Sequence, residues 1–467
     1  MSNYLRLQRA FSRSGIALSY RNGVYHVHNE AAQAQILLPA SLPLEEKAVR
    51  QLLNFASVRT PDGSSGACRA CATPDFHPGG IAPVGSVVAT SPDFVIPASI
   101  GTDINCGMRL LTTGLTLGQL APHKEALLKR LTRSLLDNGR DVPVSTRAFK
   151  ALFDDGPHAF LDSVDAIGLW AGSDFDRMQD EVAGCIGLAS FGGSAKYVPQ
   201  AYQGERHTVF RDPGLGTPGA GNHFVELQVV DTVLDRHLAW QAGLKTGDVV
   251  VMIHSGSRDL GFYVGHAWMD RAKAEWPSGV KHPESGLYGL SGPLAREYLT
   301  AMGSAARYAW ANRVVLAELV REGLEATVGA TASRLVVDVP HNVVLQEQGF
   351  NVHRKGATPA HAGELALIPG SMGDASFLAK GLGNPDWLWS CSHGAGRSMR
   401  RQEVRAQKPP LALGAEQSWQ CVTLREERRI EEAPHAYKPI GPVIEAQEEA
   451  GLIEAAVRLR PWVTFKA

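Results

Sequence analysis

Hydrophobic residues recur along this chain with two spacings, and each spacing predicts its own kind of element. Between residues 122 and 137 they recur every three or four positions, which predicts an amphipathic helix with one buried side. Pro122 suits the first turn of this helix, and Gly139 suits a stop after it. The predicted buried stripe consists of Leu127, Leu128, Leu131, Leu135 and Leu136.

A second, longer helix is predicted over roughly residues 295–322. Its buried side is expected to consist of Tyr298, Leu299, Met302, Trp310, Val314 and Leu319. Both stripes are interpreted as parts of the core and not as cofactor-binding surfaces.

Three short runs rich in β-branched residues predict buried strands, at Val249–Ile253, Leu335–Val339 and Phe224–Val230. Because helices and strands interleave, the predicted fold class is mixed α/β. Residues 1–70 show no regular hydrophobic period, and the stretch PDGSSG (61–66) predicts a loop there.

Composition is that of an ordinary globular protein, with 44% hydrophobic and 20% charged residues in 467. There is no apolar run long enough for a membrane helix, and the N-terminus lacks the apolar core of a signal peptide. Six cysteines are few for this length, so we expect no disulfide scaffold and a cytoplasmic location. Cys68 and Cys71 have CxxC spacing without a second pair, which favours a surface thiol pair over a zinc site.

The net charge of -1 does not indicate a polyanionic partner, so any RNA-binding surface must be local. Two stretches are rich in basic residues, namely Arg397, Arg400, Arg401, Arg405 and Lys408, and then Arg425, Arg428 and Arg429. Taken alone, each stretch is better explained as a solvated basic surface.

Side chains of the kinds that bind metal ions stand at the ends of the predicted strands and in nearby loops. They are Asp103, Cys106, His223, His254 and His341, all close to small residues. One histidine in such a place is more often a core or capping residue, but three together with a carboxylate and a thiol indicate a metal site. This set suits a divalent transition metal such as Mn, Co or Zn, and the carboxylate favours Mn. A thiolate could bridge two ions, as two-metal phosphoryl-transfer sites require.

Two further segments are typical of phosphate binding. PGSMG (369–373), followed by Ser376, is a loop of small and hydroxyl-bearing residues. In CSHGAGR (391–397), His393 precedes a glycine turn that ends in an arginine. Backbone N–H groups in such turns and arginine side chains bind phosphate, and a histidine there can attack phosphorus. On its own, however, this loop fits a buried structural histidine better.

Ten segments, in order from about residue 74 to the C-terminus, resemble the RtcB family of RNA ligases. They are PDFH (74–77), DINCGMRL (103–110), GAGNHFVE (219–226), VMIHSGSR (251–258), DVPHN (338–342), VHRKGAT (352–358), PGSMGDASF (369–377), SHGAGRSMRR (392–401), AYK (436–438) and RLRPWVTFKA (458–467). The resemblance implies an RtcB-like fold, with mixed sheets and flanking helices around a central two-metal cleft. Residues 71–467 would form this catalytic domain, with a less typical segment at about 150–215. Residues 1–70 would be a variable region of the same domain.

The resemblance also implies the site residues. Asp103, Cys106 and His223 would hold one manganese ion, and Cys106, His254 and His341 the other, with the thiolate shared. His393 matches the family's guanylylated histidine. The implied GTP-binding residues are Asn222, His223, Phe224, Val225, Glu226, His341, Asn342, Pro369, Gly370, Ser371, Met372, Ser376, His393, Gly394, Ala395, Gly396, Tyr437 and Lys466.

The implied reaction joins RNA ends in tRNA splicing or RNA repair. A 2′,3′-cyclic phosphate is opened to a 3′-phosphate by a metal-activated water, and GTP guanylylates His393. The 3′-phosphate then takes the GMP, and a 5′-hydroxyl displaces it. Because the histidine must attack in its neutral form, a partner should hold its other ring nitrogen, and Ser392 or a backbone carbonyl could do so. An activating protein partner is a further possibility, and no membrane is implied.

Four residues depart from the family's pattern, at Asn105, Asp259, Pro359 and Asp374. An added carboxylate near the RNA path would repel phosphate, so substrate preference could differ. Two other functions remain open at this point. One is a metal-dependent phosphodiesterase or phosphatase that acts on RNA ends without joining them. The other is a non-catalytic RNA-binding protein, against which the intact set of ligands and the nucleophile argue.

Overall fold

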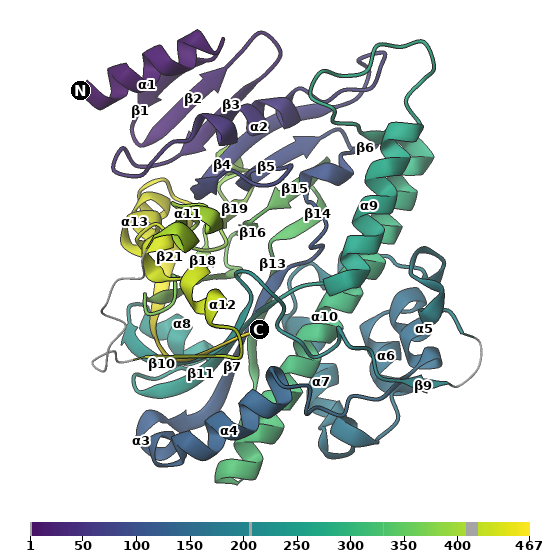
Figure 1. Ribbon diagram of the computed structural model, residues 1–467, viewed down its shortest axis with the longest axis vertical. Coiled ribbons are helices and arrows are strands. Elements are labelled where there is room, and N and C mark those ends of the chain that lie inside the picture. The colour runs from purple at the N-terminus through teal and green to yellow at the C-terminus, as the bar shows by residue number, and fades with distance from the viewer. Residues whose placement is uncertain (1, 205–207, 330, 408–418) are drawn as a thin grey trace.

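The computed structural model describes residues 2–204, 208–329, 331–407 and 419–467. Helices and strands interleave along these residues and form two large sheets, which confirms the mixed α/β class. The seven-stranded sheet lies in the upper part of Figure 1 and the eight-stranded sheet in the lower part. Lys408 of the first basic stretch lies outside the described residues.

The seven-stranded sheet joins the N-terminal strands to strands from the middle of the chain. Its spatial order is β1 (Ala17–Arg21), β2 (Val24–His28), β3 (Gln33–Leu37), β4 (Ala67–His77), β5 (Val84–Thr90), β15 (Phe350–Lys355) and β14 (Asn342–Glu347). All neighbours pair antiparallel except β3 and β4. The first strands therefore extend the same sheet that carries the PDFH segment.

The eight-stranded sheet carries most of the predicted strands. Its order is β13 (Leu335–Pro340), β7 (Gly107–Thr116), β11 (Asp248–Ser255), β10 (Phe224–Val233), β21 (Ile453–Lys466), β18 (Ser376–Gly381) and β17 (Leu365–Ile368), and β20 (Gln420–Thr423) also pairs with β21. Three two-stranded sheets complete the set: β6 (Phe94–Val95) with β12 (Leu290–Ser291), β8 (Val144–Ser145) with β9 (Val209–Phe210), and β16 (Ala357–Pro359) with β19 (Ser390–Ser392). The three strands predicted from β-branched runs are thus confirmed, each extended by one to three residues.

Thirteen α-helices are found among the described residues. They are α1 (Ser2–Arg13), α2 (Glu46–Ala56), α3 (Leu117–Leu120), α4 (Lys124–Leu135), α5 (Thr146–Asp154), α6 (Pro157–Ser163), α7 (Phe175–Glu181), α8 (Arg236–Gln241), α9 (Arg258–Ala274), α10 (Gly292–Val328), α11 (Arg401–Ala406), α12 (Glu426–Glu431) and α13 (Ile440–Glu449). The first predicted helix is confirmed as α4, but Pro122 was misplaced, because it lies in a separate 3-10 turn just before that helix. None of these helices is both long and apolar enough to cross a membrane.

The second predicted helix is confirmed as α10, but its burial was underestimated. Every residue from 301 to 321 is buried, so the middle of α10 is enclosed on all sides and not along one stripe. Val315 and Leu319 belong to the same hydrophobic cluster as Val251 and Ile253 of β11. Helices α4, α5 and α9 pack against α10 elsewhere. Polar residues in this enclosed stretch, such as Asn312 and Arg313, were therefore not recognised as buried from the sequence.

Residues 1–70 contain more regular structure than their hydrophobic pattern indicated. They form two helices and three strands, and the predicted loop at 61–66 lies in turns and bends before β4. The strands were missed because they are only five residues long and alternate irregularly. How the chain divides into domains stays a prediction.

The surface thiol pair predicted at Cys68 and Cys71 is wrong. Both cysteines lie on β4, where Cys68 is exposed but Cys71 is buried in the core. Burial raises the pKa of the Cys71 thiol to about 12. All six cysteines are free thiols, as expected for a chain without a disulfide scaffold.

Candidate functional site

The topology of the eight-stranded sheet explains why the predicted metal ligands meet. Cys106 immediately precedes β7, His223 precedes β10, His254 is next to last in β11, and His341 follows β13. These four strands are neighbours in the order β13-β7-β11-β10, and each pairs antiparallel with the next. The starts of two strands and the ends of the other two therefore lie at one edge of the sheet.

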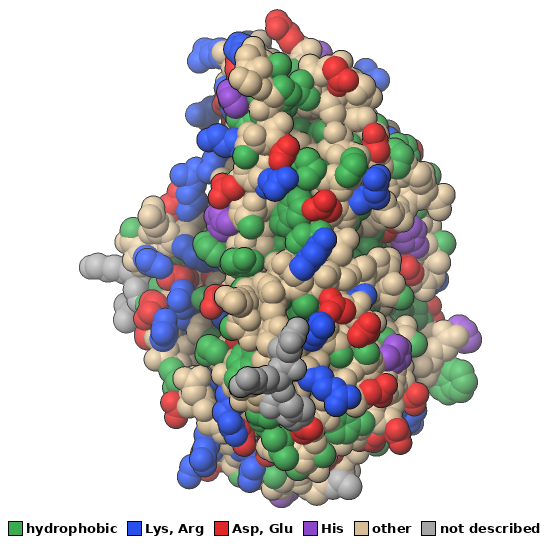
Figure 2. Space-filling model, turned by 90° about the vertical axis from the view of Figure 1, so that its right-hand side faces the viewer, with side chains coloured by type: hydrophobic (Ala, Val, Ile, Leu, Met, Phe, Trp, Pro, Cys, Tyr) green, Lys and Arg blue, Asp and Glu red, His purple; other side chains and the backbone are tan. Residues whose placement is uncertain are grey.

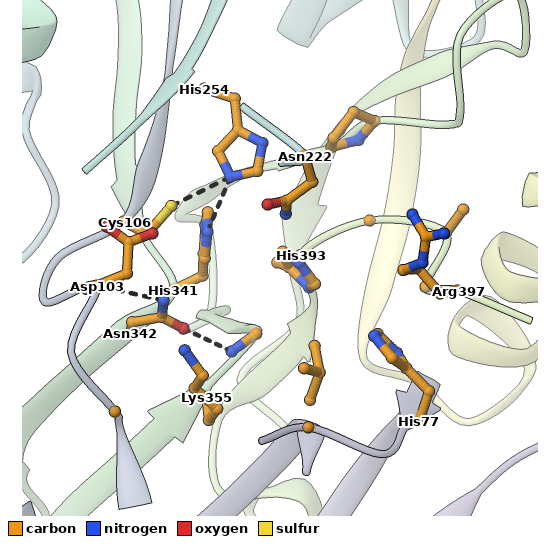
Figure 3. A pocket seen from close by; sticks show the side chains of 18 of the residues that line it. His77, Asp103, Cys106, Asn222, His254, His341, Asn342, Lys355, His393 and Arg397 are labelled. Atoms are coloured by element: carbon orange, nitrogen blue, oxygen red, sulfur yellow. Dashed lines mark hydrogen bonds between the residues drawn. The ribbon is translucent and has the colours of Figure 1, made fainter. Parts of the chain in front are cut away.

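All five predicted metal ligands come together at this edge, and Figure 3 shows four of them, Asp103, Cys106, His254 and His341. The Cys106 Sγ atom lies 3.1 Å from His223 Nε2 and 3.2 Å from His254 Nε2. Asp103 Oδ2 lies 3.0 Å from His223 Nε2, and His341 Nε2 lies 3.1 Å from His254 Nε2. The thiol is thus in the middle of a continuous row of donor atoms, which is the position a bridging ligand would have.

The electrostatics of this cluster suit divalent cations. Burial first, and then neighbouring imidazoles, lower the pKa of His254 and His341 well below the usual value, so both rings present lone pairs. Burial and the Asp103 carboxylate raise the pKa of the Cys106 thiol well above its usual value. A bound cation would reverse that shift by stabilising the thiolate. For Asp103, burial would raise the pKa, but His223 outweighs it and keeps the carboxyl ionised.

A buried arginine supports three of the ligand-bearing segments from behind. Arg313 of α10 donates to the Asn105 carbonyl oxygen at 2.8 Å and to the Ser255 carbonyl oxygen at 3.1 Å. It also binds both carboxylate oxygens of Asp338 on β13, at 2.7 to 3.1 Å. The two carbonyl groups are adjacent in sequence to two of the ligands, and Asp338 lies three residues before a third. Arg313 therefore fixes the spacing of these segments.

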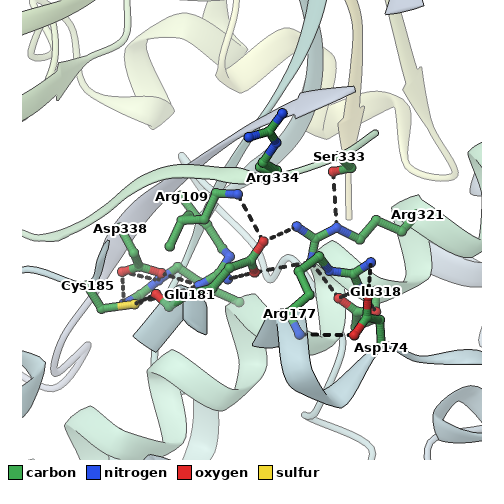
Figure 4. A network of polar contacts seen from close by, with 12 residues as sticks. Arg109, Asp174, Arg177, Glu181, Cys185, Glu318, Arg321, Ser333, Arg334 and Asp338 are labelled. Carbon is green, nitrogen blue, oxygen red and sulfur yellow. Dashed lines mark hydrogen bonds and ion pairs between the residues drawn. The ribbon is translucent and has the colours of Figure 1, made fainter. Parts of the chain in front are cut away.

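This support continues into a larger buried network of ion pairs, shown in Figure 4. Arg109 of β7 contacts Asp338 at 3.3 Å and Glu181 of α7 at 2.7 Å. Glu181 also pairs with Arg321, which in turn pairs with Glu318 at 2.6 Å. If one member of a buried ion pair is removed, the other is left as an unpaired buried charge, which is destabilising. Each member of this network therefore constrains its neighbours. The sheet edge that carries the ligands is thereby tied to both α7 and α10.

His393 lies next to the metal cluster, with its ring centroid 4.7 Å from that of His341. Its Nδ1 atom lies 2.6 Å from the Oδ2 atom of Asp75, a fully buried carboxylate at the end of β4. The partner expected from the sequence, Ser392 or a backbone carbonyl, is therefore wrong. Asp75 lies in the motif PDFH (74–77), but nothing in the sequence spacing pairs it with His393, a histidine 318 positions away.

The Asp75 carboxylate is held firmly. Thr73 donates to its Oδ1 atom at 2.6 Å. Burial would raise the pKa of Asp75, but the hydrogen bond from His393 and its charge outweigh burial and lower it. Lys438 donates to the carbonyl oxygens of Pro74 and Phe76, at 3.0 and 2.6 Å. Since the backbone N–H of Lys438 also donates to Gly396 at 2.9 Å, this lysine joins the Asp75 segment to the loop after His393.

A pocket of about 560 Å³ opens beside the cluster and His393. Fifteen of the predicted GTP-binding residues line it, namely Asn222, Phe224, Glu226, His341, Asn342, Pro369, Gly370, Ser371, Met372, His393, Gly394, Ala395, Gly396, Tyr437 and Lys466. The other three predicted GTP-binding residues do not line the pocket. The Val225 side chain is in the core, Ser376 accepts a hydrogen bond from Gln228, and His223 is among the metal donors. Sequence reasoning did not assign His77, Lys355, Arg401 and Glu432, which also line the pocket.

The end of the pocket away from the metal donors is polar and enclosed. Burial raises the pKa of the Glu226 carboxyl to about 7, although Thr464 and Gln228 both donate to it. Tyr437 donates to Glu432, and the Arg397 guanidinium lies 5.0 Å from the centre of the tyrosine ring. This end offers carboxylate acceptors, a lysine donor and an aromatic face, which together suit a purine base.

The basic stretches are only partly a solvated surface. Arg397 and Arg401 pair with the buried Glu432, at 3.0 and 2.9 Å. Arg405 and Arg428 pair with the fully buried Glu431. Arg400 and Arg425, in contrast, are exposed. Several of these arginines therefore hold α11 and α12 in place beside the pocket.

The four departures from the family pattern lie in different environments. Asp259 is exposed on α9, and Pro359 is buried in β16. Asp374 accepts a hydrogen bond from the backbone of Ile440 at 3.2 Å. Asn105 has a φ of 51° and donates to the Ala306 carbonyl oxygen at 2.7 Å. Asp259 and Asp374 thus add carboxylates that are at least partly accessible, the first on α9 and the second after the pocket-lining loop 369–372.

Comparisons with known proteins agree with the motifs. A family model described as tRNA-splicing ligase RtcB matches residues 51–467. The chain is 32% identical over 428 residues to the tRNA-splicing ligase RtcB of Pyrobaculum aerophilum, which covers 83% of this chain and 85% of that protein. It is 34% identical over 427 residues to the RNA-splicing ligase RtcB of Mycobacterium bovis, with coverages of 84% and 95%. The corresponding protein of Archaeoglobus fulgidus is 30% identical over 463 residues, with 90% of each chain covered.

Proposed function

This chain belongs to the RtcB family, and on that premise we propose that it joins RNA ends through a guanylyl group carried on His393. The substrates are an RNA 2′,3′-cyclic phosphate or 3′-phosphate end and a 5′-hydroxyl end, in tRNA splicing or RNA repair. The observation that carries the proposal is the Asp75–His393 pair beside a row of metal donors in one pocket.

Asp75 and His393 have separate roles in the proposed reaction. Asp75 holds Nδ1 of His393, so that Nε2 keeps its lone pair and faces the pocket. Nε2 attacks the α-phosphorus of GTP, a P–N bond forms, and pyrophosphate leaves. The ring then carries a positive charge, which the Asp75 carboxylate stabilises. The RNA 3′-phosphate displaces the histidine from the GMP, and the 5′-hydroxyl finally displaces the GMP.

The cofactor of this reaction is proposed to be manganese. Asp103, Cys106 and His223 would hold one ion, and Cys106, His254 and His341 the other. Bound ions would neutralise phosphate charge during transfer. The backbone N–H groups of Gly394, Gly396 and residues 370–372 would bind the phosphates, whereas the Ala395 N–H donates to the Pro369 carbonyl oxygen. Glu226, Tyr437 and Lys466 would bind the guanine base.

The test uses the purified full-length chain. Incubation with GTP labelled at the α-phosphate and Mn²⁺ should produce a covalent adduct that is stable to base and labile to acid, as phosphoramidates are. Adding RNA with a 2′,3′-cyclic phosphate and RNA with a 5′-hydroxyl should then give a joined product. Failure to form the adduct with any divalent metal, with or without a candidate activating protein, would overturn the proposal.

Replacement of Asp75 should slow guanylylation without removing the metal site. Asp75→Ala loses both orientation and charge, and we expect a decrease on the order of 10³-fold in the single-turnover rate of adduct formation. Asp75→Asn keeps an oxygen that can accept from Nδ1 but loses the charge, so a smaller decrease, on the order of 10²-fold, is expected. Mn²⁺ binding should remain as in the wild type. Equal rates in all three proteins would show that the carboxylate is not used.

A further inference from the structure

One face of α9 forms an apolar lip at the mouth of the active-site pocket. Phe262, His266 and Met269 recur at the spacing that places side chains on one helical stripe. The rings of Phe262 and His266 lie 4.2 Å apart, and Phe262 is 59% exposed. Although its ring contacts that of His266, Phe262 stays more than half exposed beside the reaction pocket.

Helix α9 lies unusually close to the metal-binding loop. A Cβ atom on Gly261 would lie 2.7 Å from the Thr102 carbonyl oxygen, and one on Gly265 would lie 3.0 Å from the Thr102 Cα atom. Two glycines one turn apart thus allow the helix backbone to approach the residue before Asp103. The apolar lip is therefore rigidly placed relative to the metal donors.

Another apolar side chain, Ile81, lines the same pocket and belongs to a turn that is held in place. Ile81 is 48% exposed in the turn that follows His77. Gln51 of α2 holds this turn in both directions, since it donates to the Gly79 carbonyl oxygen at 3.0 Å and accepts from the Gly79 N–H at 3.2 Å. A Cβ atom on Gly79 would lie within 1.8 Å of the Ala82 carbonyl oxygen, so the turn is tight. A residue of the N-terminal region thus supports the pocket mouth.

Ile81, His266 and Met269 line the same pocket as His393 and the metal donors. The basic side chains that line it, including Lys355 and Arg397, come from other elements. Asp259 lies on the same stripe of α9 as Phe262 and places a negative charge beside the apolar lip. Figure 2, a view of the side that carries α9, shows hydrophobic side chains at the surface among charged ones. A flat apolar group fits this lip, whereas a phosphate does not.

We propose that the apolar lip of α9, made of Phe262, His266 and Met269, together with Ile81 binds the nucleobase of the terminal nucleotide of an RNA end. The base stacks on the exposed face of Phe262, whose ring lies against the tilted ring of His266, and its phosphate is directed toward the basic side of the pocket. Stacking on aromatic side chains tolerates any sequence, which suits an enzyme that reads the chemistry of an end. This inference rests on the proposed ligase function.

The test separates RNA binding from the reaction with GTP. Phe262→Ala should raise the KM for RNA in the joining reaction about tenfold, because the variant loses the stacking of one base. Adduct formation with GTP, which needs no RNA, reports whether the variant is folded. The matched control is Trp240→Ala, which removes an exposed aromatic ring on α8, away from the pocket, and should leave the KM unchanged.

RNA with an abasic terminal nucleotide identifies the contact. The wild type should lose about the same tenfold on one abasic end, 3′ or 5′, and Phe262→Ala should lose nothing further on that substrate. His266→Ala should behave in the same way. The inference is overturned if the KM is unchanged in both variants. It is also overturned if the substitution and the abasic end raise the KM independently, so that their factors multiply. Either result leaves the ligase function standing. If the wild type joins no ends at all, the proposed function and this inference both fall.

Discussion

His393→Ala is expected to abolish the GTP adduct and to reduce joining of RNA ends at least about 10⁴-fold, the scale seen when a covalent nucleophile is removed. The reason is that no other described imidazole in the pocket combines a free lone pair with a carboxylate on its second nitrogen. The metal donors do not include His393, so opening of the 2′,3′-cyclic phosphate should persist. The measurement follows labelled GMP on the protein and both RNA products in one time course.

This variant also separates the ligase from the phosphodiesterase considered from the sequence. A phosphodiesterase would open the cyclic phosphate, form no adduct and tolerate His393→Ala. His435→Ala serves as the matched control. His435 is an exposed histidine near the same loop, and it is not among the residues that line the pocket. An adduct that survives in His393→Ala but disappears in another variant would move the nucleophile to that other residue.

The clustering of the five proposed metal ligands was predictable because these residues lie at or near strand ends. In an antiparallel sheet, the start of one strand and the end of the next lie at the same edge, so Cys106 before β7 and His254 at the end of β11 must be neighbours once those strands pair. The β-branched run of β11 and the histidine that ends it are both visible in the sequence. The pairing of the strands is not, and it was the resemblance that indicated which ends meet.

The contact between Asp75 and His393 could not be predicted from sequence spacing. The Asp75 carboxylate belongs to the seven-stranded sheet, and His393 follows β19, which pairs with β16 in a separate two-stranded sheet. The two residues meet because the sheets pack against each other, and no local period records such packing. The same holds for Arg313, which looks like an ordinary charged residue of a helix until α10 is seen to be enclosed.

The N-terminal region illustrates a different limit. The family model begins at residue 51, and Gln51 is the residue that holds the turn at the pocket mouth. Strands β1 to β3 precede the matched region but extend the sheet that ends in Asp75 and His77. Residues outside the family pattern therefore support residues inside it. Short strands before the matched region give weak periodicity, although they are fixed by a sheet that the matched region builds.

Cys106→Ala should remove both metal ions and with them nearly all activity. The Cys106 Sγ atom is the only described donor within 3.2 Å of imidazoles from both proposed ion sites. Each proposed site would keep two ligands, and the negative charge between the two cations would be gone. We expect the bound manganese, measured by elemental analysis after gel filtration, to fall from about two ions per chain to below about 0.2. Joining should fall at least about 10³-fold.

The control for this variant is Cys185→Ala, which removes another buried thiol, near Arg109 and outside the donor cluster. It should keep both ions, so a loss of metal in Cys106→Ala alone cannot be attributed to a missing buried thiol. Cys106→Ser tests the charge, because a buried serine hydroxyl does not ionise as a cation-bound thiol does. It should bind metal about as poorly as the alanine variant. If instead two ions remain bound to Cys106→Ala, the thiolate does not bridge them, and the row of donors from Asp103 to His341 must be divided between the ions in another way.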